Sequence, residues 1–295
     1  MKTYVLITPV RNEEEYIGQL IDSVLRQSIL PMKWVIVSDG STDDTERIVI
    51  LKTKQHPFVQ LVRLEKKSKR SFGSKALAFR KGYNVVQNLD YDYIGNLDGD
   101  VTFETNYYER MIEEMGRNPQ LGVASGVCLD KTDYGFKRTL SSLNHAVGAV
   151  QFWRRSCFEA IEGYQPTTVG GVDSLAELNA RMRGWETRSF ADLPVYHHKP
   201  VDTANARTGI HIAYRAGMTE YHIGTYPLFA VLKAFRRWQQ SPRIISAFIR
   251  LFAYGKLWVT RAPRDATVEL ESYLKKEQLA SIKRVLQGKI KAIFP

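Results

Sequence analysis

Short, apolar, β-rich segments alternate with amphipathic segments along the N-terminal part of the chain, and this alternation restricts the fold more than any other feature. Residues 4–10 read as a buried strand, and residues 13–27 then carry apolar side chains at helical spacing, with Asn12 as the expected N-cap. The same strand–helix unit recurs three times before a further apolar segment at 121–129. Such alternation is typical of a mainly parallel sheet, so we predict an α/β domain with helices on both faces.

Polar and acidic side chains gather directly after three of the predicted strands. Arg11 and Glu13 follow the first strand, Asp39 follows the second, and Asp98 and Asp100 follow the fourth. Ligands of parallel sheets bind in the crevice at the carboxyl ends of the strands. We therefore expect these loops to converge on one ligand site.

The tripeptide Asp98-Gly99-Asp100 is by itself typical of a tight turn. Its place among the other acidic loops favours a metal site instead. Two carboxylates suit Mg²⁺ or Mn²⁺, which complete their coordination with water and phosphate oxygens. The chain contains neither G-x-x-x-x-G-K-[ST] nor, after its first strand, G-x-G-x-x-G, so a nucleotide would need another mode of binding. A metal that bridges a nucleoside diphosphate fulfils that need.

Four segments in this order give the chain its resemblance to family-2 glycosyltransferases of the GT-A fold: "TPVRNEE", "VSDGSTDDT", "GSKALAFRKGY" and "NLDGDVTF". The resemblance covers about residues 3 to 200 and implies a Rossmann-like sheet that binds a nucleotide-sugar. The donor-site residues that we expect are Pro9, Arg11, Glu13, Asp39, Lys75 and Asp98. By resemblance, Asp39 contacts the base, whereas Asp98 and Asp100 serve the ribose, the diphosphate and the metal.

Family members that invert the anomeric centre use a late carboxylate as general base. The matching segment is "GGVDSLAELNARMRGW", which makes Asp173 the expected catalytic base and Glu177, one turn later, the substitute. Asp173 also suits a helix N-cap, and both roles are compatible. In such chains a histidine near this segment can reach the metal or the diphosphate. His197 and His198 are adjacent and would face opposite sides of a strand, so we expect only one of them at the site and choose His198.

The positive charge is concentrated near the C-terminus. Residues 1–200 hold 26 Lys and Arg against 25 Asp and Glu, whereas residues 201–295 hold 16 against 6. We therefore predict a GT-A catalytic domain over 1–205 and a basic, amphipathic helical region over 206–295.

The aromatic side chains of this basic region suit the headgroup level of an anionic membrane, and Trp238, Tyr254 and Trp258 are the residues that we expect there. Packing of these helices on the catalytic domain is the alternative. No uncharged run approaches the ~20 residues that a membrane span requires.

Together with the resemblance, these features predict an inverting glycosyltransferase that moves one sugar from a nucleotide-sugar to a glycan or lipid-linked acceptor in surface polysaccharide synthesis. The expected donor is a UDP-sugar and the expected cofactor is Mn²⁺ or Mg²⁺. We expect a cytoplasmic protein, because two cysteines are too few for a disulfide framework. The basic C-terminal region further predicts a peripheral location on the inner face of the cell membrane. The alternatives are a sugar-phosphate nucleotidyltransferase and a basic nucleic-acid-binding module. Acidic loops at the ligand edge argue against nucleic acid as a partner.

Overall fold

The computed structural model of the chain describes residues 2–65, 73–138, 142–199, 209–236 and 243–288. It divides into two compact units, one made of Met1–Pro166 with Asn179–Pro200 and the other of Thr167–Leu178 with Val201–Pro295. The predicted boundary between residues 205 and 206 lies outside the described residues, as does Trp238. The sequence did not indicate that residues 167–178 group with the second unit.

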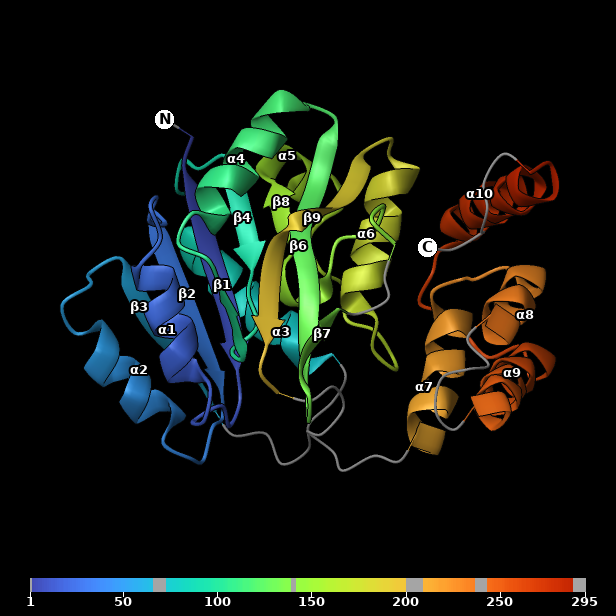
Figure 1. Cartoon of the computed structure of the whole chain (residues 1–295), viewed down its shortest axis with the longest axis horizontal. Helices are drawn as coiled ribbons and strands as arrows, with labels where there is room; N and C mark the ends of the chain where they lie inside the picture. The colour runs from blue at the N-terminus through green and yellow to red at the C-terminus, as the bar shows by residue number, and fades with distance from the viewer. Residues whose placement is uncertain (1, 66–72, 139–141, 200–208, 237–242, 289–295) are drawn as a thin grey trace. The chain divides into compact units, whose positions relative to one another are not determined.

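The first unit is built on a nine-stranded sheet within the described ranges (Figure 1). Its strands are β1 (Tyr4–Val10), β2 (Lys33–Asp39), β3 (Val59–Leu64), β4 (Tyr93–Asn96), β5 (Val101–Phe103), β6 (Leu121–Thr132), β7 (Gly135–Arg138), β8 (Phe152–Arg154) and β9 (Glu186–His197). Their order is β3-β2-β1-β4-β8-β6-β9-β5, and β7 forms a hairpin with β6. Strands β3, β2, β1 and β4 are parallel, as is β6 with β9. The short strands β5, β7 and β8 pair antiparallel and were not predicted.

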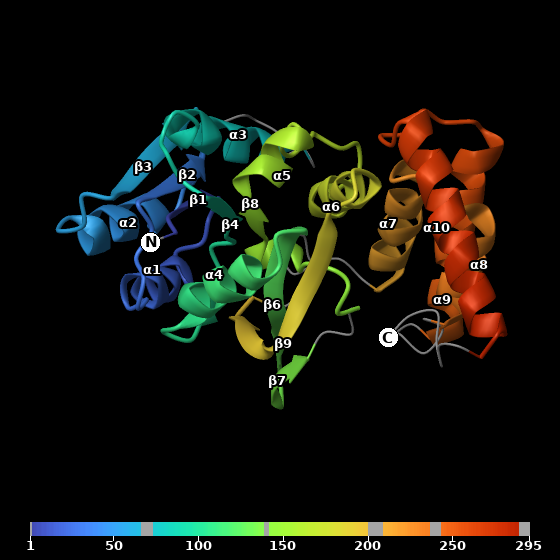
Figure 2. The ribbon, with the colours of Figure 1, turned by 90° about the horizontal axis from the view of Figure 1, so that it is seen from above.

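Helices cover both faces of this sheet, which confirms the predicted α/β class. They are α1 (Ile17–Leu25), α2 (Thr45–Thr53), α3 (Ser74–Val86), α4 (Tyr107–Arg117), the 3₁₀ turn η1 (Gly148–Val150) and α5 (Arg155–Ala160). Helix α6 (Val172–Met182) is divided between the two units, with the division between Leu178 and Asn179. Figure 2 shows α3 and α5 on one face, with α1 and α4 on the other. The largest core lies under α1 and α4, where Tyr4, Trp34 and Phe152 are fully buried.

The loop after β1 differs from the prediction. Helix α1 begins at Ile17 with Tyr16 at its N-cap, four residues later than expected. Asn12 is not the cap. It has a φ of 55°, a left-handed conformation that asparagine tolerates better than most residues, and its side chain bonds to the neighbouring loop instead. Residues 11–16 are thereby left free of the helix to line the edge of the sheet.

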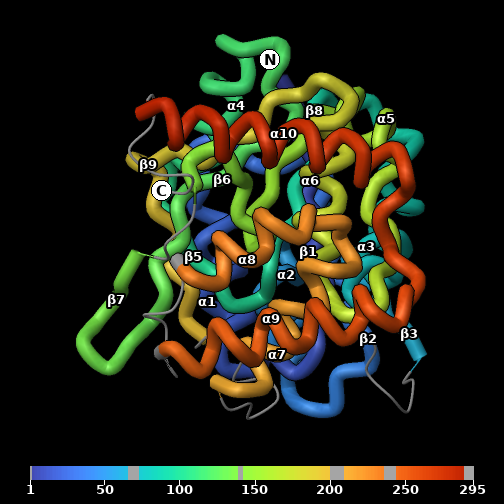
Figure 3. The backbone as a smooth tube through the Cα atoms, turned by 90° about the vertical axis from the view of Figure 1, so that its right-hand side faces the viewer, coloured from blue at the N-terminus to red at the C-terminus, as the bar shows by residue number. Residues whose placement is uncertain are grey.

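The second unit consists mainly of helices α7 (Gly209–His222), α8 (Pro227–Arg236), α9 (Arg243–Val259) and α10 (Val268–Leu286). Figure 3 shows α8 between α9 and α10. Tyr254 is buried against Tyr221, and its hydroxyl donates to the Thr225 carbonyl at 2.6 Å. The expectation of Tyr254 at headgroup level is therefore wrong, because the α9 face that carries it packs into the core of this unit.

Candidate active site

The loops after β1 and β2 are bonded to each other. The Thr42 amide donates to Asn12 Oδ1 at 2.9 Å, and the Glu13 amide donates to Thr45 Oγ1 at 2.8 Å. Thr45 in turn donates to Asp43 Oδ1. These bonds fix the backbone of Glu13 at the carboxyl edge of the sheet.

Three further predicted residues lie on or next to these loops. Arg11 Nη1 lies 3.8 Å from Asp39 Oδ2, and both side chains are partly exposed. Pro9 lies within β1 in register with Val37 of β2. Asp39 is the last residue of β2, so its carboxylate lies at the strand end where a parallel sheet binds ligands.

The Asp98-Gly99-Asp100 turn lies between β4 and β5 and is held by backbone bonds. The Asp98 amide donates to the Ala149 carbonyl at 2.9 Å. A Cβ on Gly99 would lie 3.1 Å from Val10 Cγ1 and 3.2 Å from Glu13 Cγ. Glycine at this position therefore permits the close approach that brings the turn against Glu13.

Each carboxylate of the turn has a cationic neighbour. Lys75 Nζ lies 2.5 Å from Asp98 Oδ1, and His197 Nε2 lies 3.4 Å from Asp100 Oδ2. The Asp100 side chain is buried, and within the described part of the chain its Oδ1 has no hydrogen-bond partner. Because an unsatisfied buried carboxylate oxygen is costly, this atom is a strong candidate for a ligand contact.

The two adjacent histidines have different surroundings. His197 Nδ1 lies 3.0 Å from Asp130 Oδ1, so its ring spans Asp130 and Asp100. His198 Nε2 lies 2.8 Å from Thr102 Oγ1 and only its backbone amide bonds to Asp100, through the Asp100 carbonyl. The geometry thus favours His197 over His198 as the histidine beside the Asp98-Gly99-Asp100 turn.

Lys199 completes the cationic side of the site. Its Nζ lies 2.9 and 3.0 Å from the two carboxylate oxygens of Glu13. Burial raises the pKa of Glu13, although the hydrogen bond from Lys199 opposes that shift. The cluster therefore combines three carboxylates with the side chains of Lys75, His197 and Lys199.

The pKa values of Asp98 and Asp100 are shifted in opposite directions. Burial raises the pKa of Asp98, and Lys75 only partly offsets the effect. For Asp100 burial acts in the same upward sense, but the hydrogen bond and charge of His197 outweigh it and lower its pKa. Burial opposes protonation of His197, yet hydrogen bonds to Asp100 and Asp130 raise its pKa to about 10.

These observations fit a divalent cation. Asp100 offers a buried oxygen without a partner, and the Nε2 atom of His197 is close to the same carboxylate. Carboxylate and imidazole suit Mn²⁺, and carboxylate with phosphate oxygens and water suits Mg²⁺. Asp98 is engaged by Lys75 through one oxygen.

The predicted base lies in the second unit. Helix α6 begins at Val172, so Asp173 occupies the first turn instead of the N-cap position, and there its charge is favourable to the helix dipole. Its side chain is partly exposed, whereas Glu177 is buried. Of the two carboxylates, Asp173 is therefore the more accessible to solvent.

Sequence reasoning missed Lys199 and the link between His197 and Asp130. A basic residue two positions beyond the last strand was a weak signal for Lys199. Asp130 gave a stronger one, because it directly follows the mainly apolar run 121–129 and lies two residues after Cys128, on the same face of the strand. The position of β9 beside β6 was still needed to bring Asp130 to His197.

No helix within the described residues has the length and apolarity to cross a membrane. The second unit nevertheless exposes large apolar side chains on α9. Ile244, Ile245, Phe248 and Phe252 are 54–66% exposed, and Trp258 is 56% exposed.

Curated relatives match the chain in part. A poly-beta-1,6-N-acetyl-D-glucosamine synthase from Staphylococcus epidermidis is 31% identical over 115 residues, which cover 39% of this chain and 26% of the relative. A chondroitin synthase from Escherichia coli is 31% identical over 113 residues, covering 38% of this chain and 15% of the relative. The match thus spans about a quarter or less of these relatives.

Solved structures share the fold at low identity. A mannosyltransferase from Pyrobaculum calidifontis in complex with GDP-Man and Mn²⁺ is 16% identical with a TM-score of 0.57, covering 95% of this chain and 80% of that one. S. aureus TarS in complex with UDP-GlcNAc is also 16% identical, with a TM-score of 0.54 and coverage of 73% and 66%. The predicted glycosyltransferase fold is thereby confirmed. Since the sequence model of glycosyl transferase family 2 matches residues 5–171, the chain belongs to that family.

Proposed function

We propose that this glycosyltransferase moves one sugar from a nucleotide-sugar, with a UDP-sugar as the first candidate, to a glycan or lipid-linked acceptor in surface polysaccharide synthesis. The observation that carries the proposal is the buried Asp100 carboxylate, whose Oδ1 has no partner among the described residues and whose Oδ2 lies near His197. The polysaccharide synthases among the relatives support the acceptor class, and the UDP-GlcNAc complex of TarS supports the donor class.

The donor is assigned to the carboxyl edge of the first unit's sheet. Asp39 is assigned to accept hydrogen bonds from the base, and this is supported by Pro9 and Arg11 on the neighbouring strand and loop. Asp98 is assigned to the ribose and Lys75 to the diphosphate, since Lys75 already lies against Asp98. Glu13 and its partner Lys199 close the same edge.

Mn²⁺ or Mg²⁺ is assigned to Asp100 and His197, with Asp98 as an additional carboxylate. When bound, the cation supplies Lewis-acid stabilisation of the charge on the departing nucleoside diphosphate. Asp100 holds the full negative charge that this role requires, because the pKa of its carboxyl is lowered.

Asp173 is assigned as general base. It takes the proton of the acceptor hydroxyl as that oxygen attacks the anomeric carbon, and a single displacement then inverts the centre. A positioned base contributes roughly 10²- to 10⁴-fold in rate. Its partly exposed position in the first turn of α6 supports this role.

The second unit is assigned to the membrane surface. The exposed residues Ile244, Phe248 and Phe252 recur every four residues on α9, which gives one apolar helix face. With 16 Lys and Arg against 6 acids in residues 201–295, this region suits the anionic inner face of the cell membrane. Flotation with anionic vesicles tests it: the F248E/F252E variant should lose the binding that wild type shows, and wild type that never floats would contradict it.

The donor assignment is tested by calorimetry with UDP, GDP and their sugars, each with Mn²⁺, Mg²⁺ or EDTA. We expect metal-dependent binding of UDP or a UDP-sugar to be lost in Asp100→Ala and kept in Asp133→Ala, an exposed aspartate in the β6–β7 turn. Absence of nucleotide binding with every cation would contradict the proposed function.

A further inference from the structure

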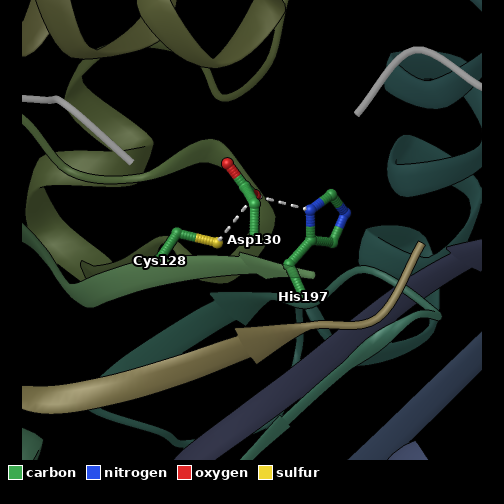
Figure 4. A group of neighbouring side chains, drawn as sticks. All are labelled: Cys128, Asp130 and His197. Carbon is green, nitrogen blue, oxygen red and sulfur yellow. Dashed lines mark hydrogen bonds and ion pairs between the residues drawn. The ribbon is translucent and has the colours of Figure 1, made fainter. Parts of the chain in front are cut away.

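Cys128, Asp130 and His197 form a second group of potential metal ligands next to the proposed donor site (Figure 4). Cys128 and Asp130 are alternate residues of β6, so their side chains emerge on the same face. β9 runs parallel to β6 with His197 in register with Asp130, which brings the imidazole to that face. Residues about 70 positions apart in the sequence are thus brought together by strand pairing.

The spacing of the three side chains is close to that of a tetrahedral metal site. Cys128 Sγ lies 3.9 Å from Asp130 Oδ1, which lies 3.0 Å from His197 Nδ1. One ligand atom from each residue falls within 4.8 Å of the others. Zinc–ligand bonds of about 2.0–2.3 Å place tetrahedral ligands roughly 3.3–3.8 Å apart. Small side-chain rotations therefore suffice to meet that geometry.

The donor set differs in kind from the one at Asp100. Thiolate and imidazole are soft or borderline ligands and favour Zn²⁺ over Mg²⁺ or Mn²⁺. Three protein ligands also leave the fourth zinc position open to water. Cys128 is buried, His197 is partly buried, and both lie within strands, so the site is supported by the sheet rather than by a loop.

We propose that Cys128, Asp130 and His197 form an inhibitory Zn²⁺ site that competes with the donor-site cation for His197. When Nε2 of His197 faces a cation at Asp100, Nδ1 keeps its proton and donates to Asp130. When Zn²⁺ binds Nδ1, the remaining proton is on Nε2, which then faces Asp100 as a donor and cannot ligate metal. The two cations therefore require different forms of one imidazole.

Protons balance in this exchange. Zn²⁺ binding displaces the proton of the Cys128 thiol and the proton on Nδ1, while Nε2 takes up one proton from solvent as the other cation leaves, so the exchange releases one proton in net. No oxidation or reduction is involved. Binding of Zn²⁺ stands on the three side chains alone, whereas its inhibitory effect rests on the proposed function.

Co²⁺ titration of the full chain tests the binding, because a cobalt–thiolate bond gives an intense near-ultraviolet charge-transfer band. We expect this band in wild type and in Cys157→Ser, which alters the other buried cysteine, and its loss in Cys128→Ser. Zn²⁺ should abolish the band by displacement. Absence of the band in wild type, or its persistence in Cys128→Ser with native circular dichroism, would overturn the site.

Electron paramagnetic resonance of Mn²⁺ tests the competition in the same samples. We expect Zn²⁺ to release bound Mn²⁺ from wild type and Cys157→Ser, and to require at least about 10-fold more Zn²⁺ in Cys128→Ser. Simultaneous full occupancy by both cations would overturn mutual exclusion. A cobalt–thiolate band without any Mn²⁺ binding would uphold the zinc site and contradict the donor-site metal instead, so the two proposals fail separately.

Discussion

Each unit of the molecule contains a buried carboxylate, and the two differ in how completely their oxygens are paired. Glu220 in the second unit is 3% exposed and fully engaged: Arg250 donates to both of its oxygens at 2.8 and 2.6 Å, and Lys233 Nζ lies 2.9 Å away. Asp100 in the first unit is 8% exposed, yet its Oδ1 has no partner among the described residues.

This difference is the one expected between a carboxylate that stabilises the fold and a carboxylate that binds a ligand. Burying a carboxylate is costly unless hydrogen bonds and opposite charges compensate it. Glu220 receives that compensation inside its own helix cluster. Asp100 receives only part of it, from His197, which is the condition expected of a side chain completed by a bound cation.

The largest expected effect concerns Asp173, the proposed general base. We expect Asp173→Asn to lower kcat roughly 10²- to 10⁴-fold with little change in donor KM, because the base acts on the acceptor. Steady-state kinetics with the donor found by calorimetry measures this. An unchanged kcat would remove Asp173 from the mechanism, and Glu177→Gln would then be the variant to assay.

Removal of Glu220 should affect stability alone. Glu220→Ala leaves Arg250 buried without its partner, and we expect it to reduce the free energy of unfolding by about 3–5 kcal/mol. Urea denaturation followed by tryptophan fluorescence measures the change. The E220L/R250M double variant should recover most of the loss, and a larger loss in the double variant would show that packing, not the unpaired charge, controls stability.

Asp100 should show the opposite behaviour. We expect Asp100→Asn to weaken Mn²⁺-dependent nucleotide binding roughly 10²- to 10³-fold, comparable to the loss of one preorganised electrostatic contact. Its Tm should stay the same or rise, since a poorly compensated buried charge is removed. Calorimetry measures the nucleotide affinity and thermal unfolding measures Tm on the same preparation. A large drop in Tm would show that Asp100, like Glu220, stabilises the fold.

A smaller effect is expected at Asp130, which orients the imidazole of His197 through Nδ1. We expect Asp130→Ala to lower Mn²⁺ affinity about 10- to 100-fold, as loss of a carboxylate behind a metal-bound histidine typically does. Mn²⁺ paramagnetic resonance measures it. Thr102→Ala, which removes the partner of His198, is the matched control, and equal losses in both would reopen the choice between the histidines.

The smallest effect is the pH dependence of Glu220. Burial opposes its ionisation, but Lys233 and Arg250 outweigh burial and hold its pKa below the usual 4.5. A lowered folded pKa gives stability that is present above about pH 5 and lost as pH falls through the folded pKa. Tm should therefore fall less steeply below pH 5 in Glu220→Gln than in wild type, and parallel curves would contradict the shift.

Local pattern predicted the architecture of the first unit well. The alternation of apolar strands with periodic helices gave β1 to β4 and α1 to α4, because burial on both faces of a parallel sheet imposes both patterns on the sequence. It failed at Asn12, where a standard N-cap residue serves a loop instead, and at the short antiparallel strands. Three- and four-residue strands carry too little periodicity to be recognised.

The sequence by itself determined the fold class, the family, the acidic turn at Asp98 and Asp100 and the concentration of positive charge near the C-terminus. These properties depend only on residues close together in the sequence and on composition. Tertiary structure alone decided that His197 faces Asp100 while His198 turns to Thr102, that Lys199 pairs with Glu13, and that Cys128 and Asp130 meet an imidazole. The physical reason is strand pairing: the register of β9 between β6 and β5 fixes these distances, and no short stretch of sequence encodes that register.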